Sequence, residues 1–302
     1  MKKKAEFSKR ERLLLSLVQK VKEFGIKNFG FRKTKNFKKF EEQPGSYNRL
    51  FYQKKDEVAF SYIDPILISR ECKHGTLEKN LPLLREEGIT PEEYDMYFFV
   101  TDGIEGESLI TRQALGRSQE EFIELIFHED AHCNLGLPLD MEEAAATLIS
   151  YVATMIFLGA DQKSIIFNLV RHPYSYSNTD NNINTCYKKL TELVSLYKNK
   201  EISLVDFLKI KNKIIYNSGA INTAEISFIH TYSHYFELLD DLLCTLDWDL
   251  KKFILTMRDL AEKYPKPTGH YGSAKYFTET RTREMQIENQ IRKILAEYDV
   301  DE

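Results

Sequence analysis

The sequence predicts an α+β protein in which helices dominate, with a small sheet in its N-terminal part and a helical C-terminal part. Short segments rich in β-branched and aromatic residues precede residue 102, whereas apolar residues recur at helical spacing almost continuously from Ser118 onward. The chain has 302 residues, of which 42% are hydrophobic, which suffices for one large or two small domains with a sizeable core. We therefore divide it into an N-terminal part, 1–117, and a helical part, 118–302, which together can form one compact unit.

The N-terminal part is expected to combine helices with a few strands. An amphipathic helix is predicted over 8–24, because its apolar run is too short for the core of a signal peptide. The segments YNRLFYQ and VAFSYI flank residues 54–57 in the manner of a β-hairpin. A helix over 77–87 and a strongly apolar strand over 94–101 follow. That strand is either an edge strand that can pair with a peptide or a buried core strand.

The rest of the chain is expected to be helical. Ser118 and Glu121 form a capping-box pattern at the start of the first helix, and Asp140 and Glu143 form a second one before the next. Apolar periodicity and turn residues predict the following helices and loops: helices over 118–134, 141–158, 161–171, 182–198, 203–216, 223–245, 248–263 and 278–298, and loops over 172–184 and 265–274.

The composition narrows the class of protein. The net charge of −4 argues against nucleic acid as the main partner. No window is long and apolar enough to predict a membrane span. The four cysteines are scattered without paired spacing, which is typical of reduced cysteines in a cytoplasmic protein. We therefore expect a cytoplasmic protein, and its oligomeric state is not predicted by any of these features.

The residues HEDAH, His128 to His132, carry the most specific chemistry in the chain. They match H-E-x-x-H, and the apolar stripe before them places the pattern on a buried helix, where histidines four residues apart share one face and can bind one metal ion. Glu129 between them can act as the base that activates water at the metal. The alternative is a pair of partly buried histidines that satisfy local hydrogen bonds.

A catalytic zinc site needs a third protein ligand and an open fourth position. Glu142 and Glu143 both lie near the start of the next predicted helix, and the small residues AAAT after them would let the two helices pack closely. The helix dipole favours a glutamate at either position, so the residues alone do not decide between them. We expect one Zn²⁺ ion, since two histidines and a glutamate suit zinc well.

The segment FIELIFHEDAH, followed by EEAAAT, resembles a family of bacterial aminopeptidases of the gluzincin type, whose pattern is HExxH followed by a distant glutamate. A downstream segment, YNSGAINTAEISFIHTYSHYFELLDDLL, is also similar to that family. The resemblance covers about residues 10–260 and is strongest over 94–158. Asp130 stands where the family has an apolar residue.

The resemblance implies a zincin-like metallopeptidase fold with the site between the small sheet and the helical part. It implies that His128 and His132 bind zinc and that Glu129 is the catalytic base. It also implies Glu143 as the third ligand, because Glu142 falls where the family has an asparagine.

The expected function is therefore a zinc-dependent peptidase in which Glu129 takes a proton from water and delivers it to the leaving amine. Only the family name supports an aminopeptidase over an endopeptidase. Tyr232, in the matching downstream segment, is expected to donate to the oxyanion, with a core residue on an apolar helical face as the alternative. The competing functions are a zinc hydrolase of a non-peptide amide and a non-catalytic, zinc-stabilised binding protein. An intact Glu129 argues against the last, because a structural site needs no base.

Four further residues are candidates for substrate binding. Glu105 and Glu107 lie in a predicted loop and can hold the α-amine of a peptide, although loop glutamates are usually solvated. His230 and His234 lie four residues apart and can form a second metal site or stabilise the oxyanion. The alternative for this pair is a solvated polar stripe opposite the core.

Overall fold

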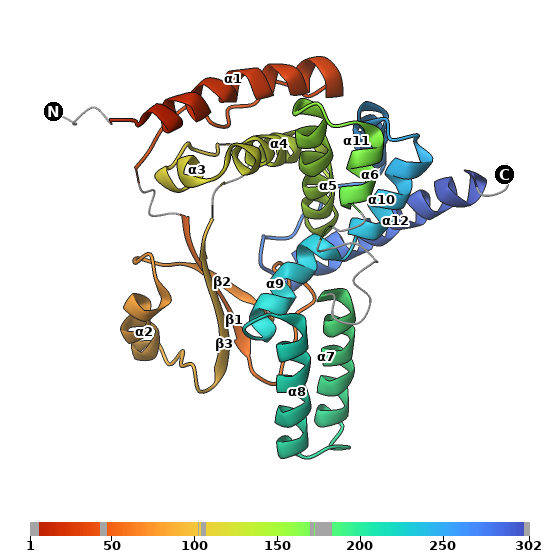
Figure 1. Ribbon diagram of the computed structural model, residues 1–302. Helices are drawn as coiled ribbons and strands as arrows, with labels where there is room; N and C mark the ends of the chain where they lie inside the picture. The colour runs from red at the N-terminus through yellow and green to blue at the C-terminus, as the bar shows by residue number, and fades with distance from the viewer. Residues whose placement is uncertain are drawn as a thin grey trace.

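A computed structural model describes residues 6–42, 47–101, 103, 107–169, 172 and 183–298. It confirms the α+β class, because helices dominate these residues and three strands form one small antiparallel sheet (Figure 1). The elements of the described residues are, in chain order, α1 (Lys9–Phe29), β1 (Asn48–Lys54), β2 (Ile68–Glu71), α2 (Leu77–Glu86), β3 (Tyr94–Val100), α3 (Arg112–Gly116), α4 (Gln119–Leu135), α5 (Leu139–Phe157), α6 (Gln162–Leu169), α7 (Ile183–Lys198), α8 (Leu204–Ser218), α9 (Thr223–Ser233), α10 (Phe236–Thr245), α11 (Leu250–Lys263) and α12 (Ala274–Tyr298).

The central strand of the sheet is β1, with β2 on one side and β3 on the other. Because side chains alternate along a strand, β1 contributes residues to the apolar clusters on both faces of the sheet. Leu50 and Tyr52 pack with α2 on the outer face, whereas Phe51 faces α9 (Figure 1). Within the described residues β3 pairs only with β1, so the strand predicted over 94–101 is an edge strand.

The predicted hairpin is wrong in its second strand. The segment VAFSYI forms turns and bends, and β1 pairs with β2 and β3 instead. The polar groups of this segment bond to α9: Nδ1 of His230 lies 2.7 Å from the carbonyl oxygen of Phe60, and the N–H of Tyr62 donates to Oγ1 of Thr231 at 3.0 Å. Side chains of the distant helix α9 therefore satisfy backbone groups of this segment that would otherwise bond to a neighbouring strand.

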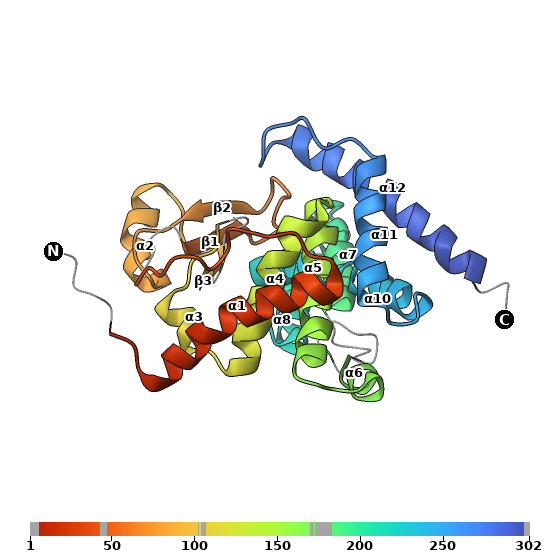
Figure 2. The ribbon, with the colours of Figure 1, turned by 90° about the horizontal axis from the view of Figure 1, so that it is seen from above.

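The helical part is centred on α4 and α5, which pack against each other within the largest apolar core. Ala144, Ala145 and Ala146 are fully buried, and their small side chains allow the close approach that the AAAT run predicts. Helices α1, α10, α11 and α12 surround the pair. Figure 2 shows α12 running past α11 and α10 and ending on the side of the molecule away from the sheet.

The start of α5 differs from its prediction. The helix begins at Leu139, after Pro138, and no side chain caps it, so the predicted capping box of Asp140 and Glu143 is wrong. Asp140 is fully buried in the first turn, where its N–H donates to Oε1 of Glu284 from α12 at 3.3 Å. This long-range partner satisfies the helix end in place of a local cap.

A single helix predicted over 223–245 is also wrong, because the chain bends between α9 and α10 at His234 and Tyr235. Apolar periodicity continues across the bend and therefore hides it. Helices α7 and α8 form an adjacent pair that packs with α9 (Figure 1). The short helix α3 was not predicted, α1 runs beyond its predicted end to Phe29, and most of the predicted loop 172–184 lies outside the described residues.

Within the part of the chain that the structure describes, no helix has both the length and the apolar character that crossing a membrane requires.

Candidate metal centre

Helix α4, which packs against α5 in the largest apolar core, carries the HEDAH residues. Its N-terminus carries the predicted capping box: Oγ of Ser118 accepts from the N–H of Glu121, and the Glu121 carboxylate accepts from the N–H of Ser118. Gly136 ends the helix with φ of 70°, a left-handed conformation that glycine adopts without steric cost. Local signals at both ends therefore fix the turn on which the two histidines lie.

Three potential ligand atoms converge at this turn. Nε2 of His128 lies 3.1 Å from Nε2 of His132, and Oε2 of Glu143 lies 3.5 Å from the first and 3.3 Å from the second. Ligands about 2.0–2.1 Å from a tetrahedral zinc ion are separated from each other by about 3.3 Å. Oε2 of Glu143 is buried and has no hydrogen-bond partner among the described residues. The spacing, the donor set and this orphaned oxygen all fit a zinc ion.

Glu142 has a different role from Glu143. Its Oε1 lies 3.1 Å from Nδ1 of His132. In the neutral form that binds a metal, the imidazole therefore donates from Nδ1 and keeps the lone pair of Nε2 for the ion. The geometry thus separates the two glutamates: Glu143 joins the candidate ligand group, and Glu142 bonds to the far nitrogen of one candidate ligand.

Glu142→Ala is expected to weaken zinc binding about 10- to 100-fold, because the ring of His132 loses the carboxylate that fixes its tautomer and orientation. Competition with a chromophoric chelator measures this change. Glu120→Ala, which removes an exposed glutamate from α4, is the matched control and should leave zinc affinity unaltered. Equal affinity in the Glu142 and Glu120 variants would contradict the orienting role.

Burial and the charges within the candidate ligand group act in opposite directions on the pKa values of its members. Burial lowers the pKa of His132, but the charges of Glu143 and Glu142 outweigh it and raise that pKa well above its usual value. Burial likewise raises the pKa of Glu143, yet the two histidines outweigh it and hold this pKa far below its ordinary range. Glu143 is therefore ionised, as a metal ligand must be.

Glu129 is held by groups from two other segments. Oγ of Ser108 donates to Oε2 of Glu129 at 2.7 Å, and the amide of Asn36 donates to the Glu129 carbonyl at 2.8 Å. Asn36 also accepts from the N–H of Ser108 at 3.0 Å, so one buried side chain positions both Ser108 and the backbone of Glu129. A β-carbon on Gly103 would lie 2.0 Å from Oε1 of Glu129, so any side chain at position 103 would displace this carboxylate from its present place.

Asp130, which departs from the resembled pattern, faces away from the ligand group. Its Oδ1 accepts from Nζ of Lys22 and from Nδ2 of Asn36, each at 3.1 Å, and from Oγ1 of Thr34. The carboxylate therefore joins α4 to α1 and to the segment that carries Asn36. The polar residue is explained by this buried network rather than by metal chemistry.

The three ligand residues open onto a cleft of about 400 Å³ between the sheet and α4, α5 and α9. Its lining, called the metal cleft below, consists of Arg49, Phe51, Tyr62, Ser69, Phe99, Thr101, Gly103, His128, Glu129, His132, Leu139, Glu143, Phe228, Tyr232 and Tyr271. Tyr232 thus lines the same cleft as the candidate ligands, which is the position that a hydrogen-bond donor to the oxyanion would require.

Sequence reasoning missed Tyr62 and Arg49. The hydroxyl of Tyr62 donates to Oε1 of Glu143 at 2.7 Å, and burial together with the Glu143 charge raises the pKa of Tyr62, so its phenol keeps the proton. Tyr62 lies in the segment that was expected to be a strand, and that expectation hid its role. The alternation of β1 could have identified Arg49 as a residue on the face of Phe51.

Of the weaker substrate-binding candidates, the three that the structure describes, Glu107, His230 and His234, do not line the metal cleft. Glu105 lies outside the described residues, and Glu107 is exposed and pairs with Lys35 at 3.8 Å. His230 is buried, stacks on Tyr187 with ring centroids 3.8 Å apart and faces a backbone carbonyl. Because His230 is buried, a solvated stripe is the wrong interpretation for it, and burial lowers its pKa to about 4. Neither His230 nor His234 lines the metal cleft.

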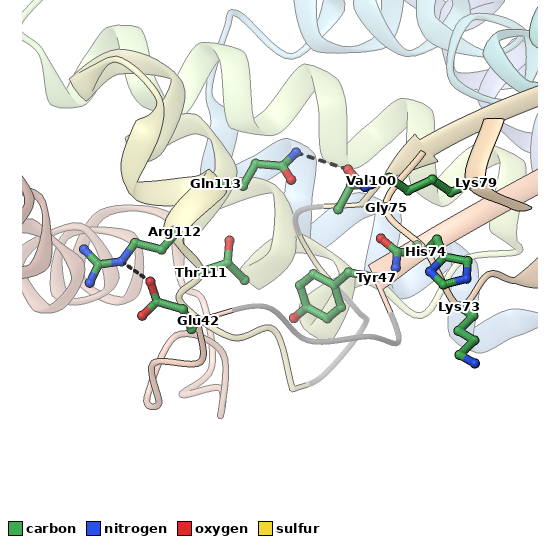
Figure 3. Close-up of a pocket in the computed structure, with 11 residues that line it drawn as sticks. Glu42, Tyr47, Lys73, His74, Gly75, Lys79, Val100, Thr111, Arg112 and Gln113 are labelled. Carbon is green, nitrogen blue, oxygen red and sulfur yellow. Dashed lines mark hydrogen bonds and ion pairs between the residues drawn. The ribbon is translucent and has the colours of Figure 1, made fainter. Parts of the chain in front are cut away.

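A second cavity, of about 480 Å³, lies near α3 and the N-terminal end of α2 (Figure 3). Arg112 faces Glu42 in it at 2.8 Å, and the amide of Gln113 donates to the Val100 carbonyl at 3.2 Å. The metal-ligand group found among the described residues lies in the metal cleft, so we assign the chemistry there despite the larger volume of this cavity.

Comparison of the chain with protein-family models, with curated protein sequences and with solved structures found no match in any of the three.

Proposed function

We propose that the protein is a zinc-dependent peptidase that hydrolyses an amide bond in the metal cleft. The observation that carries the proposal is the spacing of Nε2 of His128, Nε2 of His132 and Oε2 of Glu143, 3.1 to 3.5 Å apart, beside the carboxylate of Glu129. When bound, zinc would polarise the substrate carbonyl and acidify a water molecule.

The residues of the chain then have distinct roles. Glu129 accepts the proton of the attacking water and delivers it to the leaving amine, with Ser108 holding one of its oxygens. Tyr232 is proposed to donate a hydrogen bond to the oxyanion from the wall of the cleft. Tyr62 holds Oε1 of Glu143, which leaves Oε2 for the metal.

A peptide fits the arrangement of the cleft walls. Among the residues that the structure describes, β3 pairs only with β1, so an extended substrate can add to its other edge by backbone pairing. Together with the helix that bears HEDAH and the ligand from the next helix, this is the zincin-like arrangement that we propose for the fold. None of the four cysteines forms a disulfide bond, which fits the reducing, cytoplasmic location that we propose.

Two other functions remain as competing hypotheses. A hydrolase of a non-peptide amide would use the same residues, and only substrates distinguish it. A non-catalytic, zinc-stabilised binding protein has no use for a buried Glu129 held by Ser108 beside the ligands.

Removal of the metal tests the proposal. Purified protein is expected to contain about one zinc per chain and to hydrolyse members of a panel of peptides with free or blocked ends. A chelator should abolish cleavage, and zinc should restore it, because the proposed reaction needs the metal ion to polarise the carbonyl and to acidify the water. Mass spectrometry of the products identifies the bond that is cut.

The outcomes are distinct. Cleavage that needs a free α-amine supports the aminopeptidase expected from the resemblance, and cleavage of peptides with both ends blocked supports an endopeptidase. Bound zinc without hydrolysis of any peptide would refute the peptidase and favour a non-peptide amide or a binding protein. Full activity after verified loss of zinc would refute the metal mechanism itself.

A further inference from the structure

Arg49 is the only arginine or lysine among the described residues that line the metal cleft. It lies on β1, directly opposite Phe99 of β3 and Glu71 of β2. Its side chain is 27% exposed, and its guanidinium meets Glu71 at 3.2 Å. Because Glu71 is 59% exposed, this pair is a weak surface interaction, and the planar guanidinium has further N–H groups for another anion.

An aromatic wall begins beside this cation. The ring of Phe99 stacks on that of Phe51 at 5.9 Å, and the ring of Phe228 lies 4.9 Å from Phe99. Tyr62 and Tyr232 extend the wall toward Glu143, with ring centroids 5.8 and 5.4 Å from Phe228. One face of the sheet thus presents a guanidinium next to a broad apolar surface, and both open into the cleft of the ligand group.

The charge balance of the cleft also favours an anion. Its described lining has two carboxylates, Glu129 and Glu143, and both are engaged by the ligand group or by Ser108. With Arg49 and one divalent ion, the charges of this lining leave a single net positive charge. A substrate that carries a carboxylate complements this field, whereas an ammonium group opposes it.

We propose that Arg49 binds the terminal carboxylate of the substrate. The cleft then takes peptides or N-acyl amino acids whose last residue bears a free carboxylate and a bulky apolar side chain, with the amide of that residue at the ligand group. A guanidinium accepts a carboxylate through two parallel hydrogen bonds, and the aromatic wall accepts the side chain. This inference rests on the proposed metal-dependent hydrolysis, and it places specificity at the carboxyl end rather than the amino end.

The test compares an N-acylated dipeptide that ends in phenylalanine, as the free acid, with the same dipeptide as its C-terminal amide. Wild-type protein is expected to hydrolyse the acid with a kcat/KM on the order of 10- to 100-fold higher than the amide, the effect of charge-assisted hydrogen bonds. Arg49→Met should reduce the kcat/KM for the acid to that for the amide, so that the acid preference is lost. Arg49→Lys should recover part of the preference.

Arg70→Met is the matched control. Arg70 neighbours Glu71 on β2, but it points to the other face of the sheet, where it pairs with Glu87 at 2.5 Å. Its loss should leave both rates and the acid preference unchanged. Zinc content and near-ultraviolet circular dichroism verify that each variant is folded.

Calorimetry with N-acetyl-L-phenylalanine and its amide supplies a readout that needs no turnover. Arg49-dependent binding of the acid without hydrolysis of any substrate would support the carboxylate site and refute the proposed function. Hydrolysis with equal rates for acid and amide, or an acid preference that survives in Arg49→Met, would refute the inference and leave the proposed function standing. Neither hydrolysis nor Arg49-dependent binding would refute both.

Discussion

Glu129→Gln is expected to bind zinc as tightly as the wild-type protein and to lose hydrolysis by a factor of about 10² to 10⁴, the usual contribution of general acid–base catalysis. Glutamine has the size of glutamate and can still accept the hydrogen bond that Ser108 donates at 2.7 Å. It cannot accept a proton from water. Zinc content by elemental analysis and kcat/KM on the best peptide substrate measure the two effects separately.

The matched control is Glu120→Gln, the same substitution at an exposed position of α4. It should change neither zinc content nor rate. A Glu129→Gln protein that retains full activity would exclude Glu129 as the base. A variant that loses zinc along with activity would show instead that Glu129 supports the ligands, so the two readouts must be taken on the same preparation.

The part of this site that could be predicted from the sequence is the part that one helix encodes. Ser118 and Glu121 start α4, Gly136 ends it, and the spacing of four residues then places His128 and His132 on one face. Each of these signals acts within a few residues of the position it controls. Most helices are therefore predicted in place, and the sequence alone identifies both histidines as candidate ligands.

The third ligand could not be derived from local signals. Glu142 and Glu143 differ in direction by about 100° around α5, and the side that each faces depends on how α5 packs against α4. The structure shows α5 beginning at Leu139, with Asp140 tied to Glu284 of α12, a contact between residues far apart in the chain. The resemblance favoured Glu143, and the packing now supports it independently.

The remaining errors also come from long-range partners. Phe60 and Tyr62 lie in an apolar, β-prone segment, but His230 and Thr231 of α9 bond to its backbone and keep it out of the sheet. Arg49 was overlooked because its significance depends on strand register, which brings it opposite Phe99 and into the cleft. The pattern of residues along the chain does not reveal such long-range contacts or the register of the strands.

The wall of the metal cleft opposite α4 depends on a buried ion pair. Nζ of Lys211 on α8 lies 2.8 Å from Oδ2 of Asp95 on β3, with side chains only 4% and 10% exposed. The same carboxylate accepts from the hydroxyl of Thr223 at the start of α9, and Lys211 also donates to the Lys55 carbonyl. One pair therefore ties α8 and α9 to the sheet, and α9 carries Phe228 and Tyr232 of the cleft.

Lys211→Met is accordingly expected to lower the free energy of unfolding by about 3–5 kcal/mol, because it leaves the buried charge of Asp95 without its cation. Urea unfolding followed by circular dichroism measures the loss. Lys213→Met, an exposed position on the same helix, should change stability by less than about 0.5 kcal/mol. Adding Asp95→Asn to Lys211→Met removes the stranded charge and should recover part of the stability. If the double variant is no more stable than Lys211→Met, the loss does not come from an uncompensated carboxylate. Because methionine fills much of the volume of lysine, that outcome would require the contacts of Nζ with the Lys55 carbonyl to matter more than the ion pair.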